Sequence, residues 1–310
     1  MIHLALLGFG TVNAAVYTIL EERHEEFVQA FKDEFVVKKI LVRRQEAHPE
    51  VKELLTTDIK EITEDPEIDV LIEATGAVDE IYEDIKEALK SKHVITANKA
   101  LVSKYYEELV AFAEKSGKSL QFEAAVAGAV PVINQLKKIA TVNAIEEVVG
   151  VLNGSCNFIL SQMEEGKTFD EALKEAQALG FAEADPSADV DGLDTQRKLR
   201  LLATILFNKA IKEEDIEVEG IRQVTAKDIE QAKKEGQRYK LVARATSQGS
   251  YSVSPERVDK NSDLGLLING ENAVIVKTSN AKDLIFKGPG AGGRPTASAI
   301  LLDLLRLFDK

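Results

Sequence analysis

The stretch IHLALL at residues 2–7, followed by GFGTVN at residues 8–13, decides the fold of the first part of the chain. A short apolar run, a glycine turn and an amphipathic stretch over residues 14–32 predict a strand, a tight turn and a helix. Glycines at such a turn let backbone N–H groups and the helix N-terminus approach a pyrophosphate. We therefore expect a dinucleotide at Phe9, Gly10, Thr11 and Val12, with Asn13 in place of the usual third glycine.

The following segments repeat the alternation of strand and helix. Apolar strands are predicted at residues 35–42, 68–76 and 120–125, with a further strand in HVITANKAL at residues 93–101. Such repeats predict a Rossmann-type domain with a mostly parallel sheet and right-handed crossovers. The carboxyl ends of the strands form the ligand edge, and they carry Thr75, Gly76, Asn98 and Lys99. Lys99 is either an exposed lysine or one placed beside a bound nicotinamide.

Two arginines end the second predicted strand. Arg43 and Arg44 stand where NAD enzymes usually place an acid for the ribose 2′-hydroxyl. A guanidinium pair suits a 2′-phosphate, while a solvated strand end is the alternative. The missing acid favours NADP over NAD, and NAD stays possible.

The second half of the chain changes pattern. EEVVGVLNG at residues 146–154 predicts a strand, and Thr168 with Glu171 predicts a capping box before a helix that Gly180 ends. The alternating segments YKLVARATS, YSVSPERV and NAVIVKTSN predict strands of a mixed or antiparallel sheet. This half is therefore expected to form an α+β domain.

The tail returns to glycine chemistry. A glycine-rich run over residues 288–293 opens a last predicted helix, so Gly290 and Gly292 offer a second place where backbone closes on a cofactor. We expect this tail to pack back on the first domain. The expected domains are residues 1–130 with 288–310, and residues 131–287.

An acidic loop precedes an apolar helix at residues 180–198. Its acids repel one another and need a cation, donors or a positively charged ligand; they are Glu183, Asp185, Asp189, Asp191 and Asp194. A calcium loop is excluded because Lys198 fills the position of the bidentate glutamate. Either Asp194 caps the helix and Lys198 is a surface charge, or Lys198 is a proton donor oriented by Asp194.

Composition narrows the class of protein. The chain has 310 residues, enough for about two domains, and a net charge of −13 that disfavours nucleic acid and anionic membranes as partners. Its single cysteine, Cys156, excludes an intrachain disulfide, and its apolar context predicts a buried, inert thiol. The N-terminus lacks the basic region of a signal peptide. We expect a cytoplasmic protein.

Taken together, these motifs resemble homoserine dehydrogenase over nearly the whole chain. The stretches that carry the resemblance are GFGTV at 8–12, TANKALVS at 96–103, EAAVAGAVPVI at 123–133, NGSCNFIL at 153–160, GFAEADPSADVDGLDTQRKL at 180–199 and GPGAGGRPTA at 288–297. The long acidic segment is specific to that family. The resemblance implies reversible reduction of L-aspartate 4-semialdehyde to L-homoserine with NAD(P)H, in threonine and methionine biosynthesis.

The resemblance also implies roles for single residues. Lys198 is expected as proton donor and acceptor, and Lys99 as a second essential lysine that also contacts the cofactor. Glu183 and Asp194 are expected to bind the substrate, and Gly180 to lie beside substrate and cofactor. The expected site for a monovalent cation, sodium or potassium, consists of Glu123, Val126, Gly128 and Val130; exposed backbone carbonyls there would suit such a cation.

The family further implies a homodimer built from the middle of the chain. Departures from the family pattern are Asn13, Ala127, Ala129 and the pair Ser155-Cys156, whereas the lysines and carboxylates are intact. No amino-acid-sensing module is expected after residue 310. Two alternatives stay open: another amino-acid dehydrogenase on the same scaffold, and an NADP-binding regulator that has lost catalysis.

Overall fold

The computed structural model describes residues 1–309, and the chain divides into two compact units. Unit 1 contains Met1–Ala125 and the C-terminal segment that starts at Gly292, and unit 2 contains Val126–Ala291. Residue 310, the end of the first expected domain, lies outside the described residues. Within residues 1–309, no helix has both the length and the apolar character needed to cross a bilayer.

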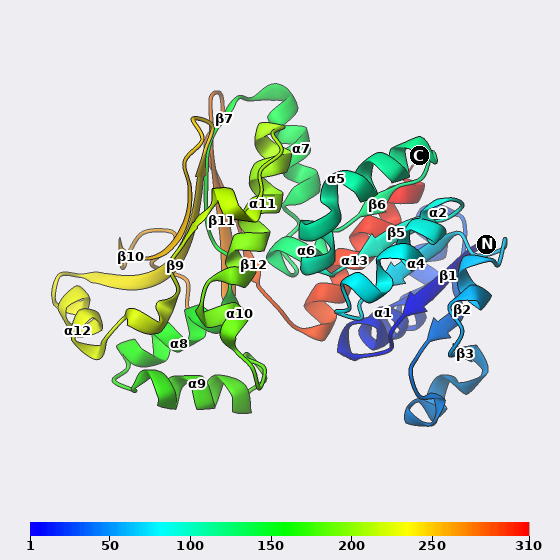
Figure 1. Ribbon diagram of the computed structural model, residues 1–310, viewed down its shortest axis with the longest axis horizontal. Coiled ribbons are helices and arrows are strands. Elements are labelled where there is room, and N and C mark those ends of the chain that lie inside the picture. The colour runs from blue at the N-terminus through cyan, green and yellow to red at the C-terminus, as the bar shows by residue number, and fades with distance from the viewer. Residues whose placement is uncertain (310) are drawn as a thin grey trace. The chain divides into compact units, whose positions relative to one another are not determined.

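Unit 1 is built on a six-stranded, fully parallel sheet (Figure 1). Its strands are β1 (Ile2–Leu7), β2 (Phe35–Leu41), β3 (Leu55–Thr56), β4 (Val70–Glu73), β5 (His93–Thr96) and β6 (Leu120–Gln121). The order β3-β2-β1-β4-β5-β6 makes the chain reverse its direction of winding between β1 and β4. A crevice for a ligand is expected outside the carboxyl ends of those two strands. The Rossmann-type fold predicted from the sequence is thereby confirmed.

The helices of unit 1 cover this sheet. They are α1 (Thr11–Glu22), α2 (His24–Phe31), α3 (Lys60–Thr63), α4 (Asp79–Leu89), α5 (Lys99–Lys115) and α13 (Gly293–Phe308), with short 3-10 turns at Gln45–Ala47 and Pro49–Leu54. The last helix, α13, packs beside α1, so the two ends of the chain share one core (Figure 1). The single helix predicted over residues 14–32 is wrong, because Arg23 leaves helical geometry at φ −117° and ψ 23° and separates α1 from α2.

The strand predicted over residues 120–125 is also too long. It ends at Gln121, and residues Ala124–Ala127 form the short helix α6. The backbone N–H of Glu123 donates to the buried carboxylate of Asp303 at 2.8 Å. That bond takes the chain away from the strand ladder, and a run of alanines then favours helix.

Unit 2 contains the second six-stranded sheet. Its strands are β7 (Ile145–Val151), β8 (Glu217–Val218), β9 (Gln237–Thr246), β10 (Tyr251–Asp259), β11 (Glu271–Thr278) and β12 (Lys282–Pro289), in the order β12-β11-β7-β9-β10-β8. Only β8 pairs in parallel, so the sheet is mixed, as predicted. The strand β12 was not predicted, because its alternation falls among exposed and charged residues next to the glycine run.

Helices cover one face of this second sheet (Figure 1). They are α7 (Ile133–Val142), α8 (Gly154–Glu164), α9 (Phe169–Ala178), α10 (Ser187–Val190), α11 (Leu193–Phe207) and α12 (Ala226–Lys234), with 3-10 turns at Glu213–Asp215 and Ile221–Gln223. Burial alternates along the strands: Val148 and Val276 are fully buried, whereas Val149 and Ile275 are partly exposed. One face of the sheet therefore belongs to the core and the other is more open.

Candidate active site

The glycine turn after β1 leaves the N-terminus of α1 open. Gly8 lies at a φ of 80°, a left-handed conformation that favours glycine, and Gly10 is the N-cap residue of α1. A Cβ at Gly10 would meet no described atom within 4 Å. The turn thus fits a pyrophosphate at the residues expected to contact it, which are Phe9, Gly10, Thr11 and Val12.

Asn13 replaces the third glycine of the usual fingerprint by a set of hydrogen bonds. Its side chain is buried, and its Nδ2 donates to the carbonyl oxygens of Leu7 at 2.9 Å and Gly8 at 2.8 Å. These bonds tie the first turn of α1 to the end of β1. The departure noted in the sequence therefore leaves the turn well anchored.

A second glycine-capped helix begins beside the first. Gly292, at φ 119°, is the N-cap of α13, and a Cβ at Gly293 would lie 2.7 Å from the Thr11 side chain. The absence of that Cβ lets the two helix N-termini lie side by side in unit 1. Gly290 belongs to unit 2 instead, where its Cα faces the amide of Asn272 so closely that a Cβ would overlap it.

The predicted 2′-phosphate contacts lie at the end of β2. Arg43 and Arg44 are both exposed, and in the described chain neither side chain has a hydrogen bond or an ion pair. Phe9 is buried, and its ring meets those of Tyr17 and His48 edge to face at centroid distances of 6.0 and 5.3 Å. The two guanidinium groups are thus available to a ligand at this edge.

The neighbouring strand ends carry the other predicted cofactor residues. Thr75 and Gly76 lie exposed after β4, and Lys99 is the first residue of α5 after β5. Because β1, β4 and β5 are adjacent parallel strands, their carboxyl ends meet at one edge of the sheet. The structure therefore brings Thr75, Gly76 and Lys99 to the edge that also holds the glycine turn.

Unit 2 holds a buried ion pair at the start of α11. The Lys198 Nζ lies 2.7 Å from the Asp194 Oδ2 and donates to the Leu152 carbonyl at 2.6 Å. Lys198 is 8% exposed and Asp194 2%. The N-cap of α11 is Gly192, so Asp194 does not cap the helix and Lys198 is not a surface charge. That interpretation of the two residues is wrong.

Two asparagines complete this pair, and sequence reasoning missed both. The Asn153 Nδ2 donates to Asp189 at 2.6 Å and to Asp194 at 2.8 Å, while its Oδ1 accepts from the Cys156 N–H and caps α8. Asn272 donates at 3.0 Å to the same Leu152 carbonyl that Lys198 uses. The sequence contained one indication, since Asn153 opens a helix in one of the family stretches.

The acidic loop is held by several separate contacts. The Ser155 hydroxyl donates to the Phe181 carbonyl, and the rings of Phe158 and Phe181 stack at 4.7 Å. Hydrogen bonds from the Ser187 hydroxyl and N–H lower the pKa of Asp185 below its usual value. Asp191 forms an ion pair with Arg222.

No cluster of three or more acidic, histidine or cysteine side chains suited to a metal occurs in residues 1–309. Gly180, at φ 77°, follows the helix α9 that begins at the predicted capping box, and Glu183 is exposed in the loop. The Glu183 carboxylate is therefore accessible to a ligand.

Cys156 is fully buried next to this cluster. Burial raises the pKa of its thiol well above the usual value, and the carboxylates of Asp189 and Asp194 add to the effect. Its Sγ donates to the Asp189 carbonyl at 3.2 Å. The prediction of a buried thiol is confirmed.

The four residues of the expected cation site fall on both sides of the division between the units. Glu123 lies in unit 1, and Val126, Gly128 and Val130 lie in unit 2. All four residues are buried, and the cation site stays a prediction. Gly128 lies at φ 63° against the Gly290 carbonyl, where a Cβ would overlap it.

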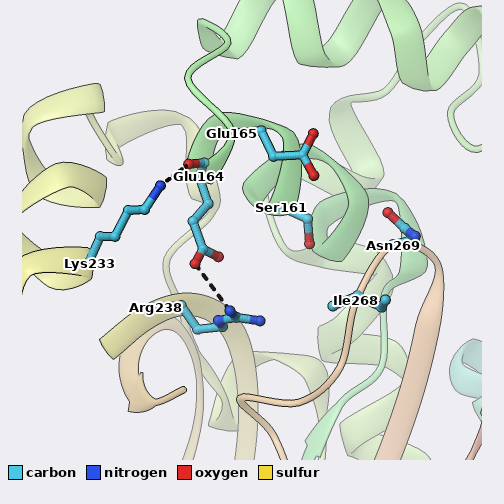
Figure 2. Close-up of a pocket in the computed structure, with 7 residues that line it drawn as sticks. All are labelled: Ser161, Glu164, Glu165, Lys233, Arg238, Ile268 and Asn269. Atoms are coloured by element: carbon cyan, nitrogen blue, oxygen red, sulfur yellow. Dashed lines mark hydrogen bonds and ion pairs between the residues drawn. The ribbon is translucent and has the colours of Figure 1, made fainter. Parts of the chain in front are cut away.

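A hollow of about 220 Å³ lies elsewhere in unit 2 (Figure 2). Charged side chains line it and are paired: Glu164 pairs with Arg238 at 3.1 Å, and Lys233 donates to the Glu164 carbonyl at 3.2 Å. The seven residues that line it are Ser161, Glu164, Glu165, Lys233, Arg238, Ile268 and Asn269. None of them belongs to the predicted site, and we assign the chemistry to the Lys198 cluster instead.

Comparison with known proteins identifies the family. The sequence profile of homoserine dehydrogenase matches residues 131–305, and that of the homoserine dehydrogenase NAD-binding domain matches residues 8–123. The chain is 40% identical to the homoserine dehydrogenase of Bacillus subtilis over 315 residues, which cover 99% of this chain and 73% of the relative.

Solved structures agree with the sequence comparison. A homoserine dehydrogenase from Thiobacillus denitrificans has a TM-score of 0.95 at 38% identity and is matched over 99% of this chain and 73% of its own. A hyperthermophilic archaeal homoserine dehydrogenase in complex with NADPH has a TM-score of 0.85 at 30% identity, over 98% and 97% of the two chains. The chain belongs to the homoserine dehydrogenase family, whose members are nicotinamide-dependent oxidoreductases that act on a CH–OH group.

Proposed function

We propose that this homoserine dehydrogenase reduces L-aspartate 4-semialdehyde reversibly with NADPH, and that Lys198 gives and takes the proton. The observation that carries the proposal is the buried ion pair of Lys198 and Asp194. Burying a charge costs free energy unless an opposite charge or hydrogen bonds compensate it, so a buried ammonium at this place needs a reason such as catalysis. Here the ammonium is oriented by a carboxylate one helical turn away and by the Leu152 carbonyl.

The reaction needs a hydride at the aldehyde carbon and a proton at its oxygen. Bound NADPH supplies the hydride. The Lys198 ammonium stabilises the alkoxide as it forms and donates the proton, which leaves the neutral amine beside Asp194. In the oxidation direction, the neutral amine takes the hydroxyl proton of homoserine. We assign Lys99 a supporting positive charge on the basis of the resemblance.

The substrate's own ammonium group explains the acidic loop. Asp189 and Asp194 converge on the Asn153 amide, and the exposed Glu183 carboxylate lies in the same loop. Carboxylates so placed are partners for an amino acid's ammonium. We propose Glu183 and Asp194 as the substrate's partners, with Gly180 beside them.

The cofactor preference is proposed to be NADP. Arg43 and Arg44 are exposed and unpaired within the described chain, and two glycine-capped helix N-termini lie beside each other. A guanidinium pair suits a 2′-phosphate, and helix N-termini suit a pyrophosphate. The NADPH complex of the archaeal relative supports this preference. We include Thr75, Gly76, Gly290 and Gly292 among the cofactor contacts.

Three further properties are proposed from the family resemblance. A monovalent cation, sodium or potassium, is assigned to Glu123, Val126, Gly128 and Val130. A homodimer is assigned to the open face of the second sheet, where Ile285 is 46% exposed and pairs across the strands with Ile275. The enzyme is assigned to threonine and methionine biosynthesis in the cytoplasm.

The direct test is an absorbance assay with the purified protein. NADPH oxidation should require L-aspartate 4-semialdehyde and should be far slower with other small oxo acids of similar length. Replacing Arg43 by Ala should weaken NADPH about tenfold or more and leave NADH nearly unchanged. Equal weakening of both cofactors would refute the 2′-phosphate assignment, and equal rates with all oxo acids would refute the substrate assignment.

The alternatives left open by the sequence are less well supported. A regulator without catalysis would not need a lysine held in a buried ion pair with a carboxylate. Family membership over the full chain disfavours a different amino-acid dehydrogenase.

A further inference from the structure

A buried carboxylate lies beneath the cofactor edge of unit 1. Glu73 is the last residue of β4 and has no exposed surface. It stands in register with Leu7 at the end of β1 and with Thr96 at the end of β5. Its position is thus between the strand that leads to the glycine turn and the strand that leads to Lys99.

One carboxylate oxygen of Glu73 holds the loop after β4. Its Oε1 accepts from the Thr75 N–H at 2.7 Å and from the Thr75 hydroxyl at 2.8 Å. The Thr75 hydroxyl accepts in turn from the Ala77 N–H at 3.2 Å. This oxygen therefore fixes both the backbone and the side chain of Thr75.

The other oxygen holds the loop after β5. The Thr96 hydroxyl donates to the Glu73 Oε2 at 2.5 Å and accepts from the Asn98 N–H at 2.9 Å. Asn98 is the N-cap of α5, accepts from the Leu101 N–H at 3.1 Å, and donates to the Ala77 carbonyl at 2.5 Å. Lys99 follows directly, so its backbone position is set through this chain of bonds.

The glycine turn rests on the same structure. At Gly8 a Cβ would lie 3.2 Å from the methyl group of Thr75. Thr75 therefore lies close to the turn that leads to Gly10. Glu73 holds the loops after β4 and β5 directly, and the loop after β1 lies beside them.

We propose that Glu73 is a positioning residue for the nicotinamide cofactor, holding Thr75 through one oxygen and Lys99 through Thr96 with the other. This rests on the proposed function of Thr75 and Lys99. The Glu73 carboxylate accepts three hydrogen bonds while fully buried. A glutamine would turn an NH₂ donor toward donor groups on one side, so the role requires a carboxylate.

Thr96→Val separates the two branches. It removes the link from Glu73 to Asn98 and leaves the bonds to Thr75 in place. A matched control is Thr56→Val, because Thr56 is buried at the end of β3 in the same sheet and its hydroxyl accepts from the N–H two residues on, at 3.0 Å. Both variants lose one buried hydroxyl, but only one of these hydroxyls leads to Lys99.

The experiment measures kcat for semialdehyde reduction, the Kd of NADPH by fluorescence, and the melting temperature. Misplacement of Lys99 in Thr96→Val should lower kcat about 10- to 100-fold, with NADPH binding within about twofold. Thr56→Val should lose similar thermal stability but keep kcat within about twofold. Glu73→Ala should weaken NADPH binding as well, because it removes the oxygen that accepts from the Thr75 N–H and hydroxyl.

A double-mutant cycle with Lys99→Met completes the test. In that background, Thr96→Val should change kcat by less than about twofold, because the residue it positions is gone. The inference is overturned if Thr96→Val behaves like Thr56→Val, or if its loss of kcat persists in the Lys99→Met background. A wild-type kcat in Lys99→Met would instead refute the proposed role of Lys99.

Discussion

Lys198 and Asp194 form a pair that single substitutions can probe. Asp194→Asn removes the negative charge that pairs with the buried Lys198 ammonium. Breaking a buried pair in this way typically lowers the free energy of unfolding by about 3–5 kcal/mol. We expect kcat to fall about 100-fold or more, since the ammonium also loses its orientation. Urea unfolding and steady-state kinetics measure the two effects.

The matched control is Asp191→Asn in the same acidic loop. Asp191 pairs with Arg222 at the surface, and exposed pairs contribute less than about 1 kcal/mol. Its stability and kcat should therefore stay near those of wild type. Equal effects of the two substitutions would show that the Lys198 pair has no special role.

Lys240 gives a pH dependence of stability. Its Nζ is buried against the Asn157 Oδ1 at 2.5 Å and the Leu267 carbonyl at 2.6 Å, and burial, with Arg238 nearby, lowers its pKa to about 8 from 10.5. Between those values the folded lysine is neutral and the unfolded lysine is charged. Unfolding then takes up a proton, so this contribution to stability rises with pH, by up to about 3 kcal/mol.

The measurement compares wild type with Lys240→Met in urea from pH 7 to pH 10.5. The stability of the wild type relative to the variant should be constant below pH 8 and should rise above it. A difference that stays flat or falls above pH 8 would contradict the lowered pKa.

At the residue scale, the sequence indicated the site where charged residues are crowded together. The crowded carboxylates and Lys198 pointed to a site, and the structure buries the Lys198 pair. Asn153 and Asn272 were missed because a neutral amide has no pattern until its partners are known, and those lie 36 to 120 residues away in the chain. The same holds for Glu73, which reads as the last residue of an apolar strand.

At the scale of elements, alanine substitutions at the two glycines that start neighbouring helices should have opposite effects on folding and on NADPH binding. Gly10→Ala meets empty space, so folding should be unchanged while NADPH weakens by about tenfold or more, because the Cβ occupies the approach of the pyrophosphate. Gly293→Ala would press on Thr11 and should lower the melting temperature. Thermal melts and NADPH titrations separate the two effects. Unchanged NADPH affinity in Gly10→Ala would refute the assignment of the pyrophosphate to this turn.

Element boundaries followed local chemistry where that chemistry was strong. The capping box of Thr168 and Glu171 begins α9 as predicted. The boundaries failed where distant partners decide: the Asp303 carboxylate draws Glu123 away from β6, and the pairing with β11 makes a strand of β12. Neither partner is adjacent in sequence, so local patterns do not contain this information.

At the scale of the whole molecule, the proposed dimer has its own test. Ile285→Asp places a negative charge on the open face of the second sheet. Its cross-strand partner is Ile275, which offers no positive charge to pair with it. A desolvated carboxylate would be costly in an interface, so we expect dissociation to monomers at micromolar concentration. Sedimentation velocity measures this. Lys277→Asp is the control, because Lys277 lies on the same face of the sheet and is already polar. It should dissociate the protein less.

The overall architecture was predictable because it depends on repeated patterns. Alternating strands and helices predicted the parallel sheet, and period-two segments predicted the mixed sheet. The order of the strands within each sheet was not predicted, because strand pairing depends on contacts between segments far apart in sequence. A dimer interface and a cation site need partners that a single chain does not contain.

The central claim is that the Lys198 ammonium delivers the proton during hydride transfer. The measurement that tests it most directly is single-turnover oxidation of bound NADPH by L-aspartate 4-semialdehyde in Lys198→Met. We predict that this step slows about 1,000-fold or more while the Kd of NADPH stays within about twofold of wild type. Hydride transfer at close to the wild-type rate, or an equal loss of NADPH binding and rate, would contradict the account.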